Sequence, residues 1–176
     1  MKLYVTRHGE TEWNRENRIL GTTDIPLNEK GIRQAESIAA ELPQEIDLII
    51  ASPLMRAART AEIIAEKNEI ELMYDNRLIE MNFGIYEGID RGNATYQAEK
   101  RKFFSRYPEG ESFLKVAQRV YNLLDEIQEK YPDRTILIVT HNGICRVINT
   151  YFSDVENEVF AAFSLKNCEL KSYEVS

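Results

Sequence analysis

The sequence contains little cysteine. Its 176 residues include two, Cys145 and Cys168, and these fall in a predicted helix and a predicted strand. Two cysteines in such places do not form the spaced framework of a secreted, disulfide-stabilised domain. We interpret them as small buried apolar side chains and expect a protein of a reducing compartment, the cytoplasm.

Long apolar runs are also missing. No stretch approaches the roughly 18 to 20 apolar residues that a membrane-spanning helix needs, and the first residues pass directly into a strand-like run without a charged and then apolar leader. Acidic residues number 29 against 22 basic ones, which gives a formal net charge of -7. The chain as a whole therefore repels nucleic acid and acidic membrane surfaces, and we expect neither as a partner. Any anionic ligand must be held by local positive charge.

Common metal and nucleotide motifs are absent as well. The chain has two histidines, and it contains no His-x-His, no His-Glu-x-x-His and no carboxylate cluster of the kind that holds a metal ion. It also lacks the Gly-x4-Gly-Lys-[Ser/Thr] loop of nucleotide triphosphatases. We expect no metal and no organic cofactor.

Apolar strand-like runs alternate with amphipathic helices along most of the chain. The runs lie at 3–5, 47–51, 71–74 and 136–140, and the helices follow caps at Asn28, at Ser52 with Pro53 and at Ser112, or begin near residue 144. This alternation predicts an α/β fold, a three-layer α/β/α sandwich with a mostly parallel central sheet. Two closing runs, Val159 to Leu165 and Glu169 to Val175, predict a hairpin that turns at Asn167 and adds an antiparallel C-terminal edge.

We expect a single domain, 1–176, because the length suits one domain and no linker-like stretch divides the chain. Between 84 and 111 the chain loses clear periodicity, and we expect this stretch, the lid segment, to form a small cap. Within it, residues 94–107 fit a short basic helix with aromatic side chains. That helix could close over a ligand or could simply be a solvated face, and the sequence favours neither.

Both histidines follow predicted buried strands. His8 lies in the turn that follows the run 3–5, and His141 follows the run that ends at Thr140. Parallel strands bring their carboxyl ends to one edge of the sheet, where open α/β sheets bind ligands. Arg7, which directly precedes His8, lies at the same edge. Arg56 also reaches it, because Arg56 lies in the first turn of the helix predicted after the second strand. Taken singly, each residue is more often structural, but together they indicate one site.

Four ordered motifs carry a family resemblance over nearly the whole chain. They are Arg7-His8-Gly9-Glu10-Thr11 with Trp13-Asn14, Ser52-Pro53-Leu54-Met55-Arg56-Ala57, Leu78-Ile79-Glu80 with Phe83-Gly84 and Glu87-Gly88, and Thr140-His141-Asn142-Gly143. Through these four motifs the chain resembles the histidine phosphatase superfamily. That superfamily includes cofactor-dependent phosphoglycerate mutases, broad-specificity phosphatases and alpha-ribazole phosphatases. The resemblance implies phosphoryl transfer through a phosphohistidine.

The resemblance also implies roles for individual residues. His8 matches the nucleophile, His141 the second histidine that stabilises the transferring group, and Glu80 the general acid. The matched phosphate-binding positions are Arg7, Asn14, Arg56, Thr11 and Asn142. The side-chain chemistry agrees, because guanidinium groups bind phosphate oxygens in pairs and neutral imidazole is nucleophilic near neutral pH. We expect the pKa of His141 to be raised if it lies against bound phosphate and Glu10 or Glu80.

Glu80 depends most on the resemblance. It lies in an irregular stretch close in sequence to Asp75 and Glu87. By chemistry alone, either of these carboxylates could be the acid or its neighbour. Only the match of the short motif that contains Glu80 selects it.

These observations predict a metal-independent phosphomonoesterase, a histidine acid-base phosphatase that hydrolyses a small phosphorylated metabolite. Two alternatives stay open: a cofactor-dependent phosphoglycerate mutase and, from a different class, a non-catalytic domain that binds a phospho-ligand. Only about 30 residues separate Glu80 from the helix capped by Ser112, fewer than in the family's mutases, so we expect the lid to exclude water incompletely. The sequence is compatible with a homodimer and does not require one.

Overall fold

The structure, a computed structural model, describes residues 1–43 and 45–174 of the chain. Five strands form one sheet in the order β3-β2-β4-β1-β5. The strands are β1 (Lys2–Arg7), β2 (Leu48–Ala51), β3 (Glu71–Tyr74), β4 (Thr135–Thr140) and β5 (Leu170–Glu174). β5 runs antiparallel to β1, and the other neighbouring pairs are parallel. The predicted mostly parallel sheet with an antiparallel C-terminal edge is confirmed.

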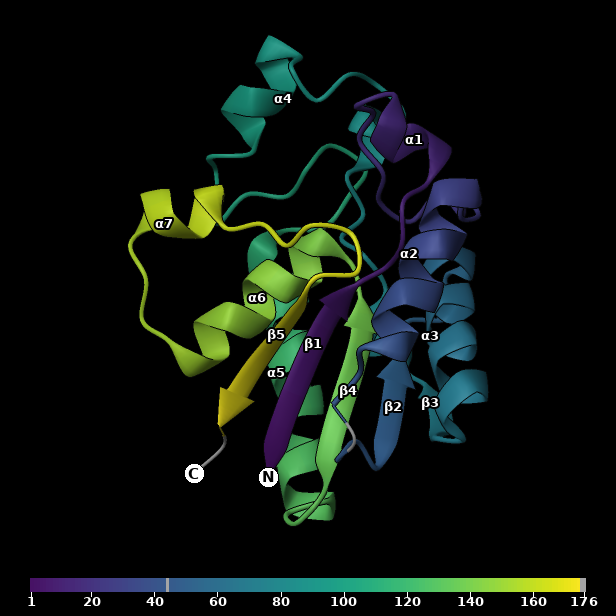
Figure 1. The fold of residues 1–176 in the computed structure, drawn as a ribbon. Coiled ribbons are helices and arrows are strands. Elements are labelled where there is room, and N and C mark those ends of the chain that lie inside the picture. Colours follow the sequence, from purple (N-terminus) through teal and green to yellow (C-terminus); the bar gives the residue numbers. More distant parts are fainter. Residues whose placement is uncertain (44, 175–176) are drawn as a thin grey trace.

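The sheet is covered by helices on both faces. Alternate side chains of a strand point to opposite faces, and in β1 Leu3 and Val5 join one apolar cluster while Tyr4 joins the other. α2 (Glu29–Ala40) and α3 (Met55–Asn68) cover the face of Tyr4. α5 (Phe113–Lys130) and α6 (Asn142–Phe152) cover the opposite face (Figure 1). The predicted three-layer sandwich is therefore confirmed.

Two of the predicted helix caps are present. The Asn28 side chain accepts a hydrogen bond from the N–H of Gly31, and the Ser112 hydroxyl accepts one from Lys115. Such caps satisfy backbone donors that the first turn of a helix leaves open.

The start of α3 differs from the expectation that Ser52 caps it. The helix begins at Met55, and the Met55 N–H donates to the Asp24 carboxylate at 2.8 Å. A carboxylate distant in sequence therefore supplies the cap, which leaves the Ser52 hydroxyl for another partner.

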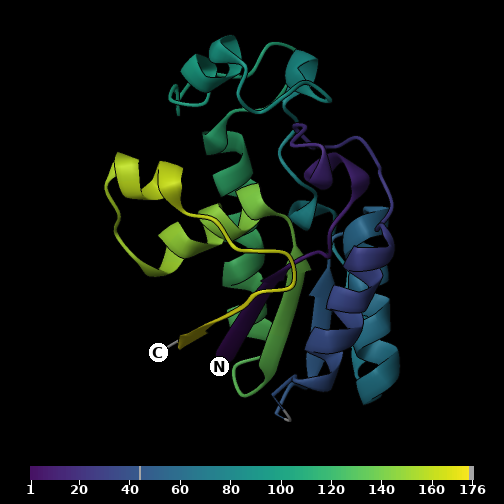
Figure 2. The same cartoon turned by 45° about the horizontal axis from the view of Figure 1, so that its top comes forward.

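Short elements gather beyond the carboxyl ends of the parallel strands. They are α1 (Glu12–Arg15), η1 (Asn76–Leu78), η2 (Gly84–Tyr86), α4 (Ala94–Glu99) and α7 (Asn157–Ala162). Figures 1 and 2 show the lid segment, with η2 and α4, beyond this edge of the sheet and the amino terminus at the opposite end. Within residues 1–43 and 45–174, no helix has the length and apolar character needed to cross a bilayer.

The predicted closing hairpin is wrong. Residues 157–162 form α7, and only β5 joins the sheet. A strand would have placed Val159, Ala161 and Phe163 on one face. The structure instead packs Phe160 edge-on against Phe103 and Phe113, with ring centroids 5.3 and 5.2 Å away, and leaves Val159 54% exposed. Val175, at the end of the second expected strand, lies outside the described residues.

The predicted helix over 94–107 is also too long. α4 ends at Glu99, and the chain then turns back so that the rings of Tyr96 and Tyr107 stack with centroids 6.1 Å apart. In a continuous helix, eleven residues would separate them by about 16 Å. Aromatic packing inside the lid therefore overrides the helical pattern.

Candidate active site

His8 lies at the carboxyl end of β1 with 3% of its surface exposed. Its Nδ1 lies 2.7 Å from the carbonyl oxygen of Gly9, and the Arg56 Nε–H donates to its Nε2 at 3.3 Å. A carbonyl can only accept, so Nδ1 carries the proton and Nε2 carries a lone pair. The surroundings thereby select one ring nitrogen as the nucleophilic atom.

The charge state of His8 suits the same role. Burial lowers its pKa well below the ordinary histidine range, and the positive charges of Arg56 and Arg7 lower it further. The imidazole is therefore neutral at pH 7. A neutral ring keeps the lone pair that nucleophilic attack requires.

His141 lies beside His8, with ring centroids 5.2 Å apart. Its Nε2 is 2.7 Å from the Ser52 hydroxyl, which also accepts a hydrogen bond from the Leu54 N–H. If the Ser52 hydroxyl donates the hydrogen bond and Nε2 accepts it, the proton of the neutral ring lies on Nδ1. Among the described residues, the buried Nδ1 has no hydrogen-bond partner.

The rise in the pKa of His141 that is expected beside bound phosphate and Glu10 or Glu80 stays a prediction, because the protein by itself shifts this pKa the other way. Burial lowers its pKa well below the usual range, and the nearby charge of Arg56 adds to the effect. The carboxylate of Glu10 cannot oppose this, because it points to Lys30 and Asn28, at 2.8 and 3.0 Å. These surroundings therefore keep the His141 imidazole neutral at pH 7.

Arg7 and Arg56 are anchored by backbone carbonyls rather than by carboxylates. Arg7 donates from NH1 to the carbonyl of Leu165 at 3.1 Å, and its buried Nε has no partner within the described part of the chain. Arg56 donates to the carbonyls of Gly21 and Thr23 at 2.7 and 3.0 Å. Burial lowers the pKa of each arginine to about 10, so both stay cationic at pH 7 and their charge is available to an anion.

Glu80 is 5% exposed and faces the amino-terminal end of α6. Its carboxylate oxygens accept hydrogen bonds from the N–H of Met81 at 2.9 Å and of Gly143 at 3.0 Å. A Cβ atom at Gly143 would lie 2.4 Å from Oε1, so only glycine lets the helix approach so closely. The backbone of the same stretch is held from outside, because Arg119 donates to the carbonyls of Arg77 and Glu80. Glu80 is thus fixed in one orientation.

The other carboxylates near Glu80 in sequence are occupied elsewhere. Asp75 pairs with Arg77 at 2.7 Å. Glu87 accepts the backbone N–H groups of Thr22 and Thr23, each at 2.8 Å. Since the Thr23 carbonyl accepts from Arg56, Glu87 supports the loop that orients the arginine.

Asn14 and Asn142 share one arrangement. The Oδ1 atom of Asn14 accepts from the N–H of Thr11 at 3.2 Å, and that of Asn142 accepts from the N–H of Leu165 at 3.0 Å. Backbone N–H groups can only donate, so these contacts fix which end of each amide is the oxygen. The other end of each amide is then an NH2 donor, and both residues line the same cavity.

Thr11 differs from the other predicted phosphate-binding residues. It is fully buried, and its hydroxyl accepts the N–H of Asn14 as the cap of α1. It does not line the cavity beside His8. Its predicted contact with phosphate stays a prediction, and its position favours a supporting role through Asn14.

One cavity opens between the sheet edge and the lid segment. Its wall combines predicted site residues with residues that the sequence did not single out. It is formed by Arg7, His8, Asn14, Leu20, Glu80, Phe83, Arg91, Tyr96, Lys100, Asn142, Gly143 and Arg146. Arg56 and His141 lie directly behind His8, in contact with its ring. The structure therefore brings the predicted residues together, Thr11 excepted.

Sequence reasoning missed several positively charged and supporting residues. Arg91 and Arg146 line the cavity, and Asn167 donates from its side chain to the His8 carbonyl at 2.7 Å. The sequence did carry a signal for Arg146, because this charged residue interrupts the apolar stretch 144–148. In the structure its side chain is buried. For Arg91 and Asn167, which lie in loops, no periodic signal existed.

Known proteins resemble this chain along most of its length. A family model described as the histidine phosphatase superfamily (branch 1) matches residues 3–176. Phosphoserine phosphatase 1 of Hydrogenobacter thermophilus is 32% identical over 183 residues, covering 99% of the chain and 85% of that protein. Probable phosphoglycerate mutase GpmB of Escherichia coli is 37% identical over 149 residues, covering 80% and 69%. A solved structure of mycobacterial glucosyl-3-phosphoglycerate phosphatase with VO3 matches with a TM-score of 0.87 at 27% identity, covering 97% of the chain and 91% of that structure.

Proposed function

Because the chain belongs to the histidine phosphatase superfamily, we propose that it is a phosphomonoesterase that hydrolyses a small phosphorylated metabolite through a phosphohistidine at His8. The observation that carries the proposal is a pair of buried atoms near His8, Arg7 Nε and His141 Nδ1, for which residues 1–43 and 45–174 offer no hydrogen-bond partner. Leaving a buried polar atom unsatisfied costs about 1–3 kcal/mol. A phosphate group offers acceptor oxygens of the kind that N–H donors at these two atoms need.

In the first step, His8 Nε2 attacks phosphorus and the bond from phosphorus to the leaving oxygen breaks. Arg7, Arg56 and His141 stabilise the charge on the transferring group, since fixed donors act strongly where water is excluded. Glu80, in its protonated form, gives its proton to the leaving oxygen. The products of this step are the free alcohol and phosphohistidine.

In the second step, water attacks the phosphorus of phosphohistidine. The Glu80 carboxylate takes a proton from that water, the bond between nitrogen and phosphorus breaks, and inorganic phosphate leaves. His8 recovers its lone pair and Glu80 its proton. A domain that only binds phospho-ligands has no need of a buried carboxylate fixed at this place, which supports catalysis over binding alone.

Hydrolysis is favoured over mutase activity by the small lid. A mutase must keep water away until a second hydroxyl accepts the phosphoryl group. In the lid segment, regular helix is limited to η2 and α4. Given 3-phosphoglycerate and 2,3-bisphosphoglycerate, the enzyme should release phosphate faster than it forms 2-phosphoglycerate. Rapid isomer exchange with negligible phosphate release would establish the mutase instead.

A panel assay tests the proposal directly. Purified protein should release phosphate from p-nitrophenyl phosphate and from a subset of phosphorylated metabolites, with and without excess chelator. No group of three or more His, Cys, Asp or Glu side chains within residues 1–43 and 45–174 could hold a metal ion, and metal independence stays a prediction. Full loss of activity on chelation, restored by a divalent ion, would refute that prediction. Activity on no phosphate ester would refute the proposal as a whole.

A further inference from the structure

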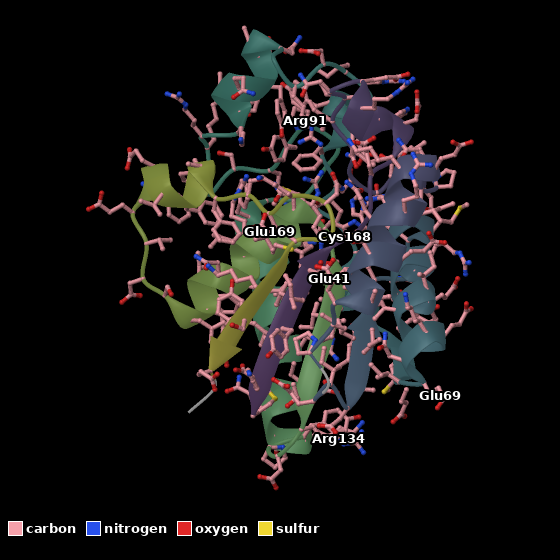
Figure 3. All side chains as sticks on the ribbon, in the orientation of Figure 1. Glu41, Glu69, Arg91, Arg134, Cys168 and Glu169 are labelled. Atoms are coloured by element: carbon pink, nitrogen blue, oxygen red, sulfur yellow. The ribbon has the colours of Figure 1, made fainter. Side chains whose placement is uncertain are left out.

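Three cations line the cavity in addition to Arg7. Arg91 comes from the lid segment, Lys100 follows α4, and Arg146 comes from α6. None of the three forms an ion pair with a carboxylate in the described part of the chain. In Figure 3, Arg91 lies close to α4, farther from the strands than Cys168. The lid segment and α6 thus bring positive charge to one space.

The charge of the cavity wall is unbalanced. Arg7, Arg91, Lys100 and Arg146 face a single carboxylate, Glu80, although the chain carries 29 acidic residues and a net charge of -7. A phosphate monoester brings about two negative charges near neutral pH. Arg56, behind His8, adds a further positive charge. One phosphate group therefore leaves the site with an excess of positive charge.

The three cations repel one another. Burial lowers the pKa of Lys100, and the charges of Arg146 and Arg91 lower it further. Arg146 is held in place, because its Nε and NH2 donate to the Phe163 carbonyl at 3.2 and 3.1 Å. It therefore cannot turn away from the cavity without losing these bonds. An anion placed among the three would relieve the repulsion and would join the lid to α6.

We propose that Arg91, Lys100 and Arg146 form a subsite for a second anionic group, so that the preferred substrate is a phosphate ester that also carries a carboxylate or a second phosphate. This inference rests on the proposed phosphatase function and narrows its substrate class. Guanidinium groups bind both kinds of anion through paired hydrogen bonds. Arg91 and Lys100 belong to the lid segment, across the cavity from His8 at the end of β1, so we assign the second anion to the alcohol that departs.

Matched substrates test the subsite. O-phosphoserine differs from O-phosphoethanolamine only by a carboxylate, and 3-phosphoglycerate differs in the same way from 2-hydroxyethyl phosphate. Fructose 1,6-bisphosphate against fructose 6-phosphate tests a second phosphate. We expect kcat/KM to favour the additional anion by about tenfold or more in at least one pair, the usual size of a charge-assisted contact. The pair that shows the preference identifies the anion.

Variants locate the effect within the lid. Lys100→Gln and Arg91→Gln should reduce this preference about tenfold. The loss should lie mainly in kcat/KM for the substrate with the additional anion, and kcat/KM for the matched substrate without that anion should change little. Lys102→Gln is the matched control, because Lys102 pairs with Glu99 and does not line the cavity. Calorimetry on His8→Ala with phosphoserine and phosphoethanolamine reads the subsite without turnover.

The outcomes separate this inference from the proposed function. Turnover of p-nitrophenyl phosphate without preference in any of the three pairs would overturn the subsite and leave the phosphatase intact. Equal losses on both members of each pair in Lys100→Gln and Arg91→Gln would also overturn it. Without any turnover, tighter calorimetric binding of phosphoserine than of phosphoethanolamine would still support the subsite, and equal binding would overturn it.

Discussion

The two ends of the cavity are built on different principles. At the sheet end, His8, Arg56 and His141 are almost fully buried, and backbone carbonyls and a serine hydroxyl orient them. At the lid end, Arg91 and Lys100 are partly exposed and come from a segment with little regular structure. Fixed dipoles suit a reaction whose charge develops at one place, while a less ordered lid can admit and release ligand. The difference suggests that one end carries the chemistry and the other selects the substrate.

The largest effect should follow from removing the nucleophile at the sheet end. His8→Ala should lower kcat on every phosphate ester by roughly 10⁴-fold or more, since no other group can form the phosphoryl-enzyme. Phosphate-release assays measure this, and circular dichroism checks that the fold is kept. Lys102→Gln, a lid variant outside the cavity, should keep full activity. A His8→Ala protein that retains a tenth of the activity would assign the chemistry elsewhere.

A smaller and selective effect should follow at Glu80. Glu80→Gln should lower kcat on alkyl phosphates by about 10²-fold while sparing p-nitrophenyl phosphate, whose leaving group departs as a stable anion. Glu87→Gln is the control, because Glu87 binds the N–H groups of Thr22 and Thr23 instead of lining the cavity. Equal losses on both substrates would indicate damage to binding or folding. Selectivity in Glu87→Gln alone would show that Glu87 is the acid.

Asn167 tests whether the sheet end depends on its backbone supports. Its side chain donates to the His8 carbonyl at 2.7 Å, so Asn167→Ala should lower kcat about fivefold, the value of one net hydrogen bond of about 1 kcal/mol. Steady-state kinetics should show little change in KM, because the residue touches no part of the lid end. A rise in KM at constant kcat would place Asn167 in ligand binding.

The last effect concerns stability against pH and leaves catalysis aside. Both histidines have a lowered pKa in the folded protein, so below about pH 6.5 the unfolded chain binds protons that the folded chain does not. The free energy of unfolding should therefore fall as pH falls from about 7 to about 5.5, by about 1 kcal/mol per histidine. Urea unfolding of wild type and of His141→Asn should show a smaller loss in the variant. The same loss in both would show that His141 is not buried in its neutral form.

The sheet end could be predicted from sequence because it follows from strand ends. Buried strands bounded by polar turns place Arg7, His8 and His141 at one edge whatever the details of packing. The neutral charge of His141 could not be predicted in this way. It depends on the burial of the ring and on Arg56 behind it, which only the tertiary structure brings together.

The lid end and the C-terminal segment were predicted less well for a related reason. Their conformations are set by contacts between distant aromatic rings, such as Phe160 against Phe113 and Tyr96 against Tyr107. Local periodicity carries no information about such pairs, so the run from Val159 to Leu165 predicts a strand where the structure forms α7. Arg91 lies in a loop, so its place in the cavity wall could not be predicted from local periodicity either.

Trapping the phosphoryl-enzyme tests the central claim most directly. Rapid-quench labelling with a ³²P-labelled ester, followed by peptide mapping, should give an acid-labile, alkali-stable phosphoprotein that carries its label on Nε2 of His8. The label should be absent from His8→Ala. A label that survives this substitution, or an acid-stable ester on a serine, would contradict the account.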